Sequence, residues 1–226
     1  MCRLYHIDKT PRELARQFGL RLDLPLPNFA PSWRVATTDP APVVRRHPQT
    51  GERRLDVLHW GLVPHWVNEP KGAPRPVNAR SDSVATGGMF RGAYQARRCL
   101  VPATGWYEWQ SRSSGRKQAH AFARQDGRPI AFAGLWESVR WPNGEVLRTF
   151  AILTTEPSVE AAVIHERMPL TLGEADWPLW LGEIDGDPAA LLHPPPDGTF
   201  RISPILSPLG KGRPNGPELL NPMPTP

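Results

Sequence analysis

GWYEWQSRSSGRKQAHAFARQDGRPIAFAGLW, residues 105–136, is the stretch that decides the fold. It contains three strand-like runs, residues 106–110, 119–124 and 130–136, with turn signals between them at Ser114-Gly115 and Asp126-Gly127. Connections this short join strands that lie side by side and run in opposite directions. The stretch therefore predicts an antiparallel sheet or barrel.

Further strand patterns lie on both sides of this stretch. They cover residues 33–37, 43–44, 55–60, 100–101 and 146–155, the last preceded by the turn signal Asn143-Gly144. A helix is predicted from Pro11, because Thr10 can cap it and Glu13 stands three residues after the cap. Other short helices are expected over residues 89–98, 157–164 and 174–181 and from Asp187-Pro188. We therefore predict an α+β fold, a single domain with a mainly antiparallel β-barrel-like core and several short helices.

The domain is expected to span residues 1–205, because 226 residues suit one domain with a sizeable core. Residues 206–226 are rich in proline, so we expect them to pack on the surface or to be partly disordered. A second proline-rich segment, residues 64–78, reads as a long loop that ends at Asn78. A loop of this length inside a compact domain is often functional.

The composition limits the class of protein. No apolar run approaches the roughly 18 residues of a membrane span, and no secretory signal opens the chain, so a cytosolic protein is expected. The net charge of +5 suggests a polyanionic partner, although 23 arginines against four lysines also fit the bias of a GC-rich genome. No phosphate-binding glycine loop is present, and His59 and His65 do not fit a zinc spacing, so we expect neither cofactor nor metal.

Cys2 is the most informative single residue, because its small side chain lets the initiator Met1 be removed. The new terminus would carry an amine and a thiol, which titrate near pH ~8 and ~8.5 and are both nucleophiles near neutrality. Such a pair can attack an amide, or condense with an aldehyde to a Schiff base that the thiol closes into a thiazolidine. The alternative is a cysteine at a frayed end without a role. Cys99 is expected to be a small buried hydrophobic residue.

Three other segments carry groups suited to such chemistry. Asn78 opens the run Asn-Ala-Arg-Ser after the proline-rich loop. Glu108 lies among aromatic residues, where loss of hydration would suit it to acid or base work, although pairing with an arginine is at least as common. His165 is of the residue type best matched to proton transfer near neutral pH, but a lone histidine is more often structural.

Together these segments resemble one family closely, the SOS response-associated peptidase family, also described as abasic-site processing proteins. The matching motifs fall in order along nearly the whole chain. They are Met1-Cys2, WGLVPHW at 60–66, NARS at 78–81, RRCLVPA at 97–103, GWYEW at 105–109, AFAGLWE at 131–137, HERMP at 165–169 and GPELLNP at 216–222.

The resemblance implies a monomer with a positively charged groove for single-stranded DNA that contains abasic sites. It implies that Cys2 bonds covalently to the aldehyde of the abasic sugar, that Asn78 holds the amine or a sugar oxygen, and that Glu108 moves protons. It assigns ring opening and a strand-cleaving β-elimination to His165. It also implies action in a bacterial cytosol, at the nucleoid where DNA is damaged.

The DNA contacts implied by the resemblance are arginines for the phosphates and indole faces for the bases. They are Arg80, Arg167, Trp66, Trp106 and Arg3. Four positions depart from the commonest family pattern: Arg3-Leu4 stands in place of Gly-Arg, Asp82 in place of Glu, and His65 in place of a small polar residue.

Two other functions stay open on the sequence alone. A thiol peptidase would use Cys2 to cleave the bond after Met1 and other peptides, with Glu108 or His165 as base. A non-covalent single-stranded DNA-binding protein would use arginine and tryptophan only, and its binding would be sensitive to salt but not to the loss of Cys2.

Overall fold

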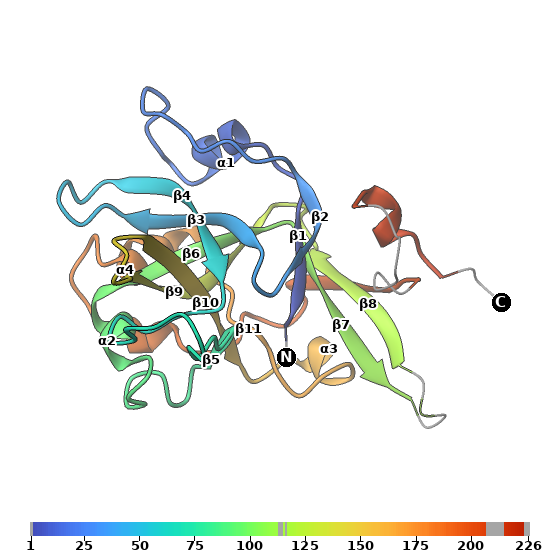
Figure 1. Cartoon of the computed structure of the whole chain (residues 1–226). Helices are drawn as coiled ribbons and strands as arrows, with labels where there is room; N and C mark the ends of the chain where they lie inside the picture. The colour runs from blue at the N-terminus through green and yellow to red at the C-terminus, as the bar shows by residue number, and fades with distance from the viewer. Residues whose placement is uncertain (1, 113–114, 116, 207–214, 224–226) are drawn as a thin grey trace.

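The computed structural model describes residues 2–112, 115, 117–206 and 215–223 (Figure 1). Met1, the first residue of the predicted turn Ser114-Gly115, and residues 207–214 and 224–226 of the proline-rich segment lie outside the described residues. Within the described part, no helix is both long and apolar enough to cross a membrane.

The centre of the fold is a closed barrel of five strands. The order is β4 (Arg53–Trp60), β3 (Pro40–Arg46), β6 (Arg98–Ala103), β9 (Ile130–Arg140) and β10 (Val146–Thr155). All of these neighbours pair antiparallel, and a short parallel pairing of β10 with β4 closes the ring. The predicted α+β domain with a mainly antiparallel barrel core is thus confirmed.

A second, fully antiparallel sheet lies beside the barrel (Figure 1). Its order is β12 (Phe200–Pro204), β8 (Lys117–Arg124), β7 (Gly105–Ser111), β1 (Leu4–Ile7) and β2 (Ser32–Ala36). The chain passes from β6 of the barrel to β7 of this sheet with only Thr104 between them. The first residues of the chain therefore lie against the strand that carries Glu108.

An aromatic core joins the two sheets. Tyr5 on β1 meets Trp60 and Phe132 of the barrel, with ring centroids 5.3 and 5.9 Å apart. Trp106 on β7 stacks on Phe122 at 4.4 Å and meets Phe132 edge to face at 5.9 Å. Aromatic pairs in these geometries stabilise beyond the apolar area they bury, so β1 and β7 are held firmly against the barrel.

Helices are short and peripheral. α1 (Pro11–Gln17) has the predicted capping box, in which Thr10 and Glu13 bond each other's backbone N–H. The others are α2 (Arg91–Ala96), α3 (Val159–Ala162), the 3₁₀ turn η1 (Glu174–Asp176) with α4 (Trp177–Leu181), η2 (Pro188–Leu191) and η3 (Pro217–Leu220). The helices predicted over 89–98 and 157–164 are both shorter than expected, the first because Arg98 already pairs in β6.

The chain from residue 188 onward holds more regular structure than its prolines suggest. β12 pairs with β8 along its whole length, and Phe200 packs edge to face on Trp106 at 4.8 Å. Pro204 is tolerated because it ends an edge strand. Further on, Ile205 bridges to Pro222, and Leu219 is buried, so residues 215–223 pack onto this edge.

Two further short strands extend the barrel sheet from β10. β5 (Asn78–Arg80) runs parallel to β10, and β11 (Met168–Pro169) runs antiparallel to it. Both come from the predicted motif segments. β10 therefore brings Asn78 and the residues around His165 to one region of the molecule.

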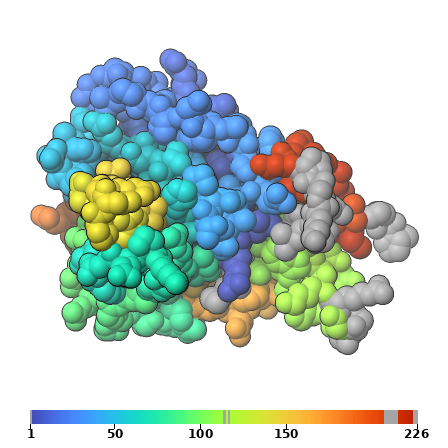
Figure 2. All heavy atoms as spheres, viewed as in Figure 1, coloured from blue at the N-terminus to red at the C-terminus, as the bar shows by residue number. Residues whose placement is uncertain are grey.

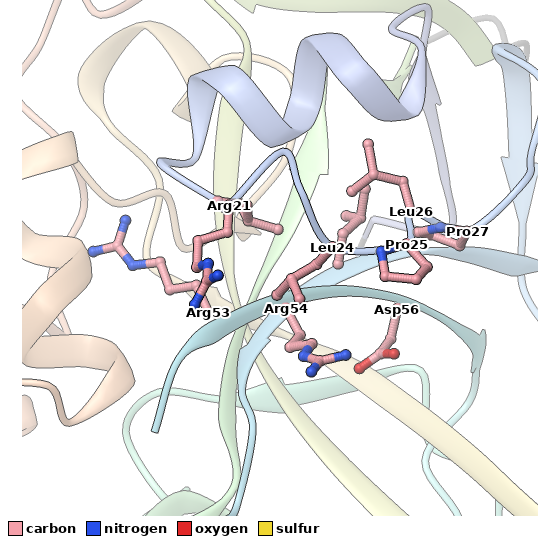
Figure 3. Close-up of a pocket in the computed structure, with 10 residues that line it drawn as sticks. Arg21, Leu24, Pro25, Leu26, Pro27, Arg53, Arg54 and Asp56 are labelled. Carbon is pink, nitrogen blue, oxygen red and sulfur yellow. The ribbon is translucent and has the colours of Figure 1, made fainter. Parts of the chain in front are cut away.

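A hollow of about 270 Å³ lies between β4 and the segment that follows α1 (Figure 3). Leu24–Pro27 form its apolar wall, and the side chains of Arg54 and Asp56 extend from the same side of β4. Beside it Arg53 forms two hydrogen bonds of 2.7 Å with Glu183 and donates to the carbonyl of Phe18. None of the predicted site residues is among the described residues that line this hollow.

Candidate functional site

Cys2 lies directly before β1, with its side chain fully buried in the main core cluster. Its Sγ lies 3.9 Å from the carbonyl oxygen of Leu4. Burial raises the pKa of the Cys2 thiol well above its ordinary value, and the negative charge of Glu108 raises it further. The thiol is therefore protonated at neutral pH and needs a base before it can attack. Cys99 is also fully buried, as predicted for a small hydrophobic residue.

Asn78 holds the backbone of Cys2. Its side-chain amide Nδ2 donates a hydrogen bond of 2.9 Å to the carbonyl oxygen of Cys2. Asn78 is itself fixed by the parallel pairing of β5 with β10 and by Trp60, whose indole N–H donates to the carbonyl of Val77 at 2.8 Å. The Oδ1 atom of Asn78 is buried and has no hydrogen-bond partner among the described residues. It is an acceptor positioned next to the N-terminal residue.

Glu108 and His165 line one open hollow of about 530 Å³. Arg3 and Trp109 are two of the other residues in its wall. Glu108 is 5% exposed, and its Oε1 accepts the backbone N–H of Trp109 at 3.2 Å. In Figures 1 and 2 the start of the chain lies beside the α3 region, which precedes His165. A ligand in this hollow would thus meet a carboxylate, an imidazole and a guanidinium.

His165 is positioned by the loop that follows α3. The backbone N–H of Arg167 donates to Nδ1 of His165 at 3.0 Å, which fixes the orientation of the ring. The loop is tied to β7 by Gln110, whose Nε2 donates to the carbonyl of Val163 at 2.8 Å. Since β7 also carries Glu108, the two groups are held by the same strand.

Arg80, Asp82 and Arg167 form one charged cluster next to β10. Arg80 pairs through Nε and Nη2 with the carboxylate of Asp82, and Arg167 lies 3.6 Å from the same carboxylate. Arg167 also donates to the carbonyl and hydroxyl oxygens of Thr154. Burial lowers the pKa of Arg167, and repulsion from Arg80 adds to the effect. Two cations thus share one anion, and Arg80 is 61% exposed.

The two tryptophans expected to stack on bases differ. Trp66 is half exposed, with its ring against His65, so a base can reach it. Trp106 is 1% exposed and stacks on Phe122 in the core, so the expectation that it offers a face to DNA is wrong. Trp109 on the same strand is partly exposed and lines the hollow, and sequence reasoning missed it.

The missed residue had a signal in the sequence. Side chains alternate along a strand, so in GWYEW the indoles of Trp106 and Trp109 lie on opposite faces. The pattern alone does not say which face is buried. The buried face is the one that carries Trp106, because Phe200 packs on this indole from β12. The prolines around β12 kept this strand from being predicted.

The structure thus brings four predicted residues into one chain of contacts. Asn78 bonds Cys2, the charge of Glu108 acts on the Cys2 thiol, and Glu108 shares a hollow with His165. In the described part of the chain, no three His, Cys, Asp or Glu side chains gather closely enough to hold a metal ion. The chemistry available from these residues is nucleophilic attack with proton transfer.

Comparison with known proteins gives consistent relatives. The chain is 29% identical over 223 residues to abasic site processing protein YoqW of Bacillus subtilis, covering 97% of this chain and 99% of that protein. It is 29% identical over 200 residues to YedK of Escherichia coli, named likewise, covering 82% and 87%. A solved structure from Bacteroides thetaiotaomicron superposes with a TM-score of 0.87 at 25% identity, covering 98% of this chain and all of the other.

The family described as SOS response associated peptidase (SRAP) matches residues 1–211. The match includes every predicted site residue from Cys2 to Arg167 and both sheets. The chain therefore belongs to the SRAP family of abasic site processing proteins.

Proposed function

We propose that this protein traps abasic sites in single-stranded DNA as a covalent thiazolidine at Cys2, once Met1 has been removed. The observation that carries the proposal is the position of Cys2. Asn78 holds its carbonyl oxygen at 2.9 Å, and the carboxylate of Glu108 acts electrostatically on its thiol. A buried cysteine at the second position, held in this way beside an open hollow, is suited to an aldehyde that enters from that hollow.

The reaction needs two bonds to the same carbon. The free amine of Cys2 adds to the C1′ aldehyde of the ring-opened sugar, and loss of one water gives an imine. The sulfur then adds to the imine carbon, and the thiol proton passes to the nitrogen, which closes the five-membered ring. Because burial keeps the thiol protonated, the second step needs a group that moves this proton, and Glu108 is that group.

Asn78 and His165 support the chemistry from two sides. The buried Oδ1 of Asn78 can accept a hydrogen bond from the terminal amine or from a sugar hydroxyl, which would orient the nucleophile. His165 lines the hollow and would pass the proton of the C1′ hydroxyl to the ring oxygen as the sugar opens, and would take the C2′ proton in β-elimination as the 3′ phosphate leaves. When the cross-link reverses, the same groups carry out these proton transfers in the opposite direction.

DNA binding is assigned to five cations and indoles, of which Arg3 and Trp109 line the hollow. Arg80 and Arg167, which share the carboxylate of Asp82, would hold phosphates together with the exposed Arg3. Trp109 and Trp66 would stack bases without regard to sequence. We propose that the protein acts in this way as a monomer in the bacterial cytosol, at damaged DNA of the nucleoid.

The test is incubation of the purified protein with a single-stranded oligonucleotide that carries one abasic site. A heat-stable, slower-migrating band is expected, together with an intact mass that lacks Met1 and contains the DNA minus water. Cys2→Ala should give no band. Cys99→Ala is the matched control, since it removes the other buried thiol and should cross-link as the wild type does. If Cys2→Ala cross-links as well as wild type, the proposal is wrong.

Peptidase activity is proposed only on the chain's own first peptide bond. The full burial of Cys2 speaks against a role on peptides in trans, because a peptide bond would have to enter the core cluster. Mass spectrometry of a Glu108→Gln variant made in a strain without methionine aminopeptidase would test self-processing. Retention of Met1 is expected there, while wild type made in that strain should have lost it.

A further inference from the structure

A third hollow, of about 660 Å³, lies away from the start of the chain. It is bounded by the tip of the β3–β4 hairpin, the end of α2, the end of α4 and Trp136 on β9. Figure 1 shows β3, β4, α2 and α4 on one side of the molecule, apart from the end marked N. None of the residues assigned above to the abasic-site chemistry is among the described residues that line it.

Two arginines in its wall bond only to carbonyl oxygens within the described part of the chain. Arg46 donates to the carbonyls of Gly51 and Gly182, and Arg98 donates to the carbonyls of Tyr94, Gln95 and Trp180. These hydrogen bonds fix the position of both guanidiniums without neutralising their charges. No ion pair to either one occurs among the residues that the structure describes.

The two charges converge on one point. A Cβ placed on Gly182 would lie 3.1 Å from Nη2 of Arg98 and 3.6 Å from Nη1 of Arg46. Burial, together with repulsion from Arg46, lowers the pKa of Arg98. Two like charges held this close in a partly buried site repel each other, and an anion between them would relieve that repulsion.

None of the other described residues of the wall carries a negative charge. Arg97 lines the hollow, and its Nη2 bonds Glu137, which is buried behind the wall. His47 also lines it, and the remaining described lining residues are polar or apolar without a carboxylate. Trp136 offers part of an indole surface next to the guanidiniums.

We propose that this hollow is a phosphate-binding site, in which Arg46 and Arg98 hold the phosphoryl oxygens. Guanidiniums held in fixed positions suit the oxygens of a phosphate, as they suit those of a carboxylate. The phosphate can belong to a free nucleotide or to a DNA strand bound by the same molecule, and the chemistry of recognition is shared. The site does not depend on the abasic-site reaction.

The experiment uses ligands that contain no aldehyde, so the cross-link plays no part. Isothermal titration with thymidine monophosphate and with inorganic phosphate measures the small ligands, and fluorescence anisotropy with an undamaged oligothymidine measures the strand. Arg46→Gln removes one charged hydrogen-bond donor and should weaken binding about tenfold. Gln49→Glu places an acid on the exposed rim of the hollow, far from any fold-determining contact, and should weaken binding about threefold.

Gln125→Glu is the matched control, because Gln125 is exposed, lies outside the hollow and makes the same change of charge. Weaker binding of the small phosphates alone identifies a free nucleotide or phosphate as the ligand, and weaker binding of the oligonucleotide identifies a strand. If Gln49→Glu binds all three ligands as Gln125→Glu does, or if wild type binds none, the site does not exist. Gln49→Glu decides the matter even if Arg46→Gln fails to fold.

Discussion

The side-chain amide of Asn78 donates a 2.9 Å hydrogen bond to the carbonyl oxygen of Cys2, across 76 positions of sequence. This bond sets the direction of the backbone that leads to the amine we propose as the nucleophile. Asn78→Ala should therefore slow cross-linking about tenfold or more, since a single buried hydrogen bond that orients a reactant is worth about 1–3 kcal/mol. The initial rate with abasic single-stranded DNA measures the effect.

Thermal unfolding of Asn78→Ala shows whether a slower reaction comes from loss of the orientation of Cys2 or from loss of stability. β5 keeps its pairing with β10 through backbone atoms, so the melting temperature should change little. Asn78→Asp is the sharper comparison, because it keeps an acceptor at Oδ1 but loses the donor to the Cys2 carbonyl. If Asn78→Ala cross-links at the wild-type initial rate, Asn78 does not orient Cys2 for the reaction.

The tryptophans give a second prediction: replacing Trp106 should affect stability, and replacing Trp66 should affect DNA binding. Trp106→Ala should lower the free energy of unfolding by about 3–5 kcal/mol, because a large ring leaves the core between Phe122 and Phe200. Trp66→Ala should leave stability unchanged, because Trp66 is half exposed, and should weaken single-stranded DNA binding by about 1–3 kcal/mol. Denaturant unfolding and anisotropy measure the two quantities, and a destabilised Trp66→Ala would contradict the assignment.

Local sequence signals predicted three strands well, two of them in the second sheet (β7 and β8) and one in the barrel (β9). The runs around 106–110, 119–124 and 130–136 each became a strand, because alternation and turn residues act between neighbours in the chain. The cap at Thr10 also formed as expected. Motif resemblance supplied the candidate site residues, which lie far apart in sequence and are brought together by the pairing of β5 and β11 with β10 and of β1 with β7.

The remaining features depend on long-range packing, which composition does not reveal. β12 is a strand because β8 offers it an edge, in spite of the neighbouring prolines. Phe200 of this strand packs on Trp106 and buries it, whereas Trp109 lines the hollow. Because β12 was not predicted, Trp106 was expected at the DNA in place of Trp109. The closure of the barrel by the parallel contact of β10 with β4 likewise has no local signature.

His6 gives a prediction for the pH dependence of stability. Burial lowers the pKa of His6 to about 4 from an ordinary 6.5, and its Nδ1 has no hydrogen-bond partner among the described residues. Above pH 6.5 the imidazole is neutral in both states, and stability is complete. As the pH falls from 6.5 towards 4, only the unfolded chain takes up the proton, so about 3 kcal/mol of stability should be lost and the loss should then level off.

Other groups also titrate in this range, so the contribution of His6 is measured as the difference between wild type and a variant that lacks the imidazole. His6→Gln removes the titrating ring and should flatten the curve of unfolding free energy against pH between 6.5 and 4, relative to wild type. Denaturant unfolding at five or six pH values gives both curves. Parallel curves would mean that His6 takes up a proton as readily in the folded protein as in the unfolded chain.

Asp82 gives the final prediction, because it holds both arginines that we assign to phosphates. Its carboxylate pairs with Arg80 and lies 3.6 Å from Arg167, so a DNA phosphate must compete with it. Asp82→Asn removes one negative charge from the proposed path of the DNA strand. Undamaged single-stranded DNA should then bind several-fold more tightly, and the salt dependence should steepen by about 0.7 in the slope of log K against log[salt] for each additional phosphate that the protein neutralises.

The opposite result is equally informative, since Asp82 also orients Arg80. If the carboxylate serves mainly to aim that guanidinium, Asp82→Asn should weaken binding and leave the salt slope unchanged or smaller. Arg80→Gln with Asp82→Asn completes a double-mutant cycle, in which the tighter binding caused by Asp82→Asn should vanish when Arg80 is absent. Tighter binding that persists in the double variant would assign the released charge to Arg167, the other cation on the same carboxylate.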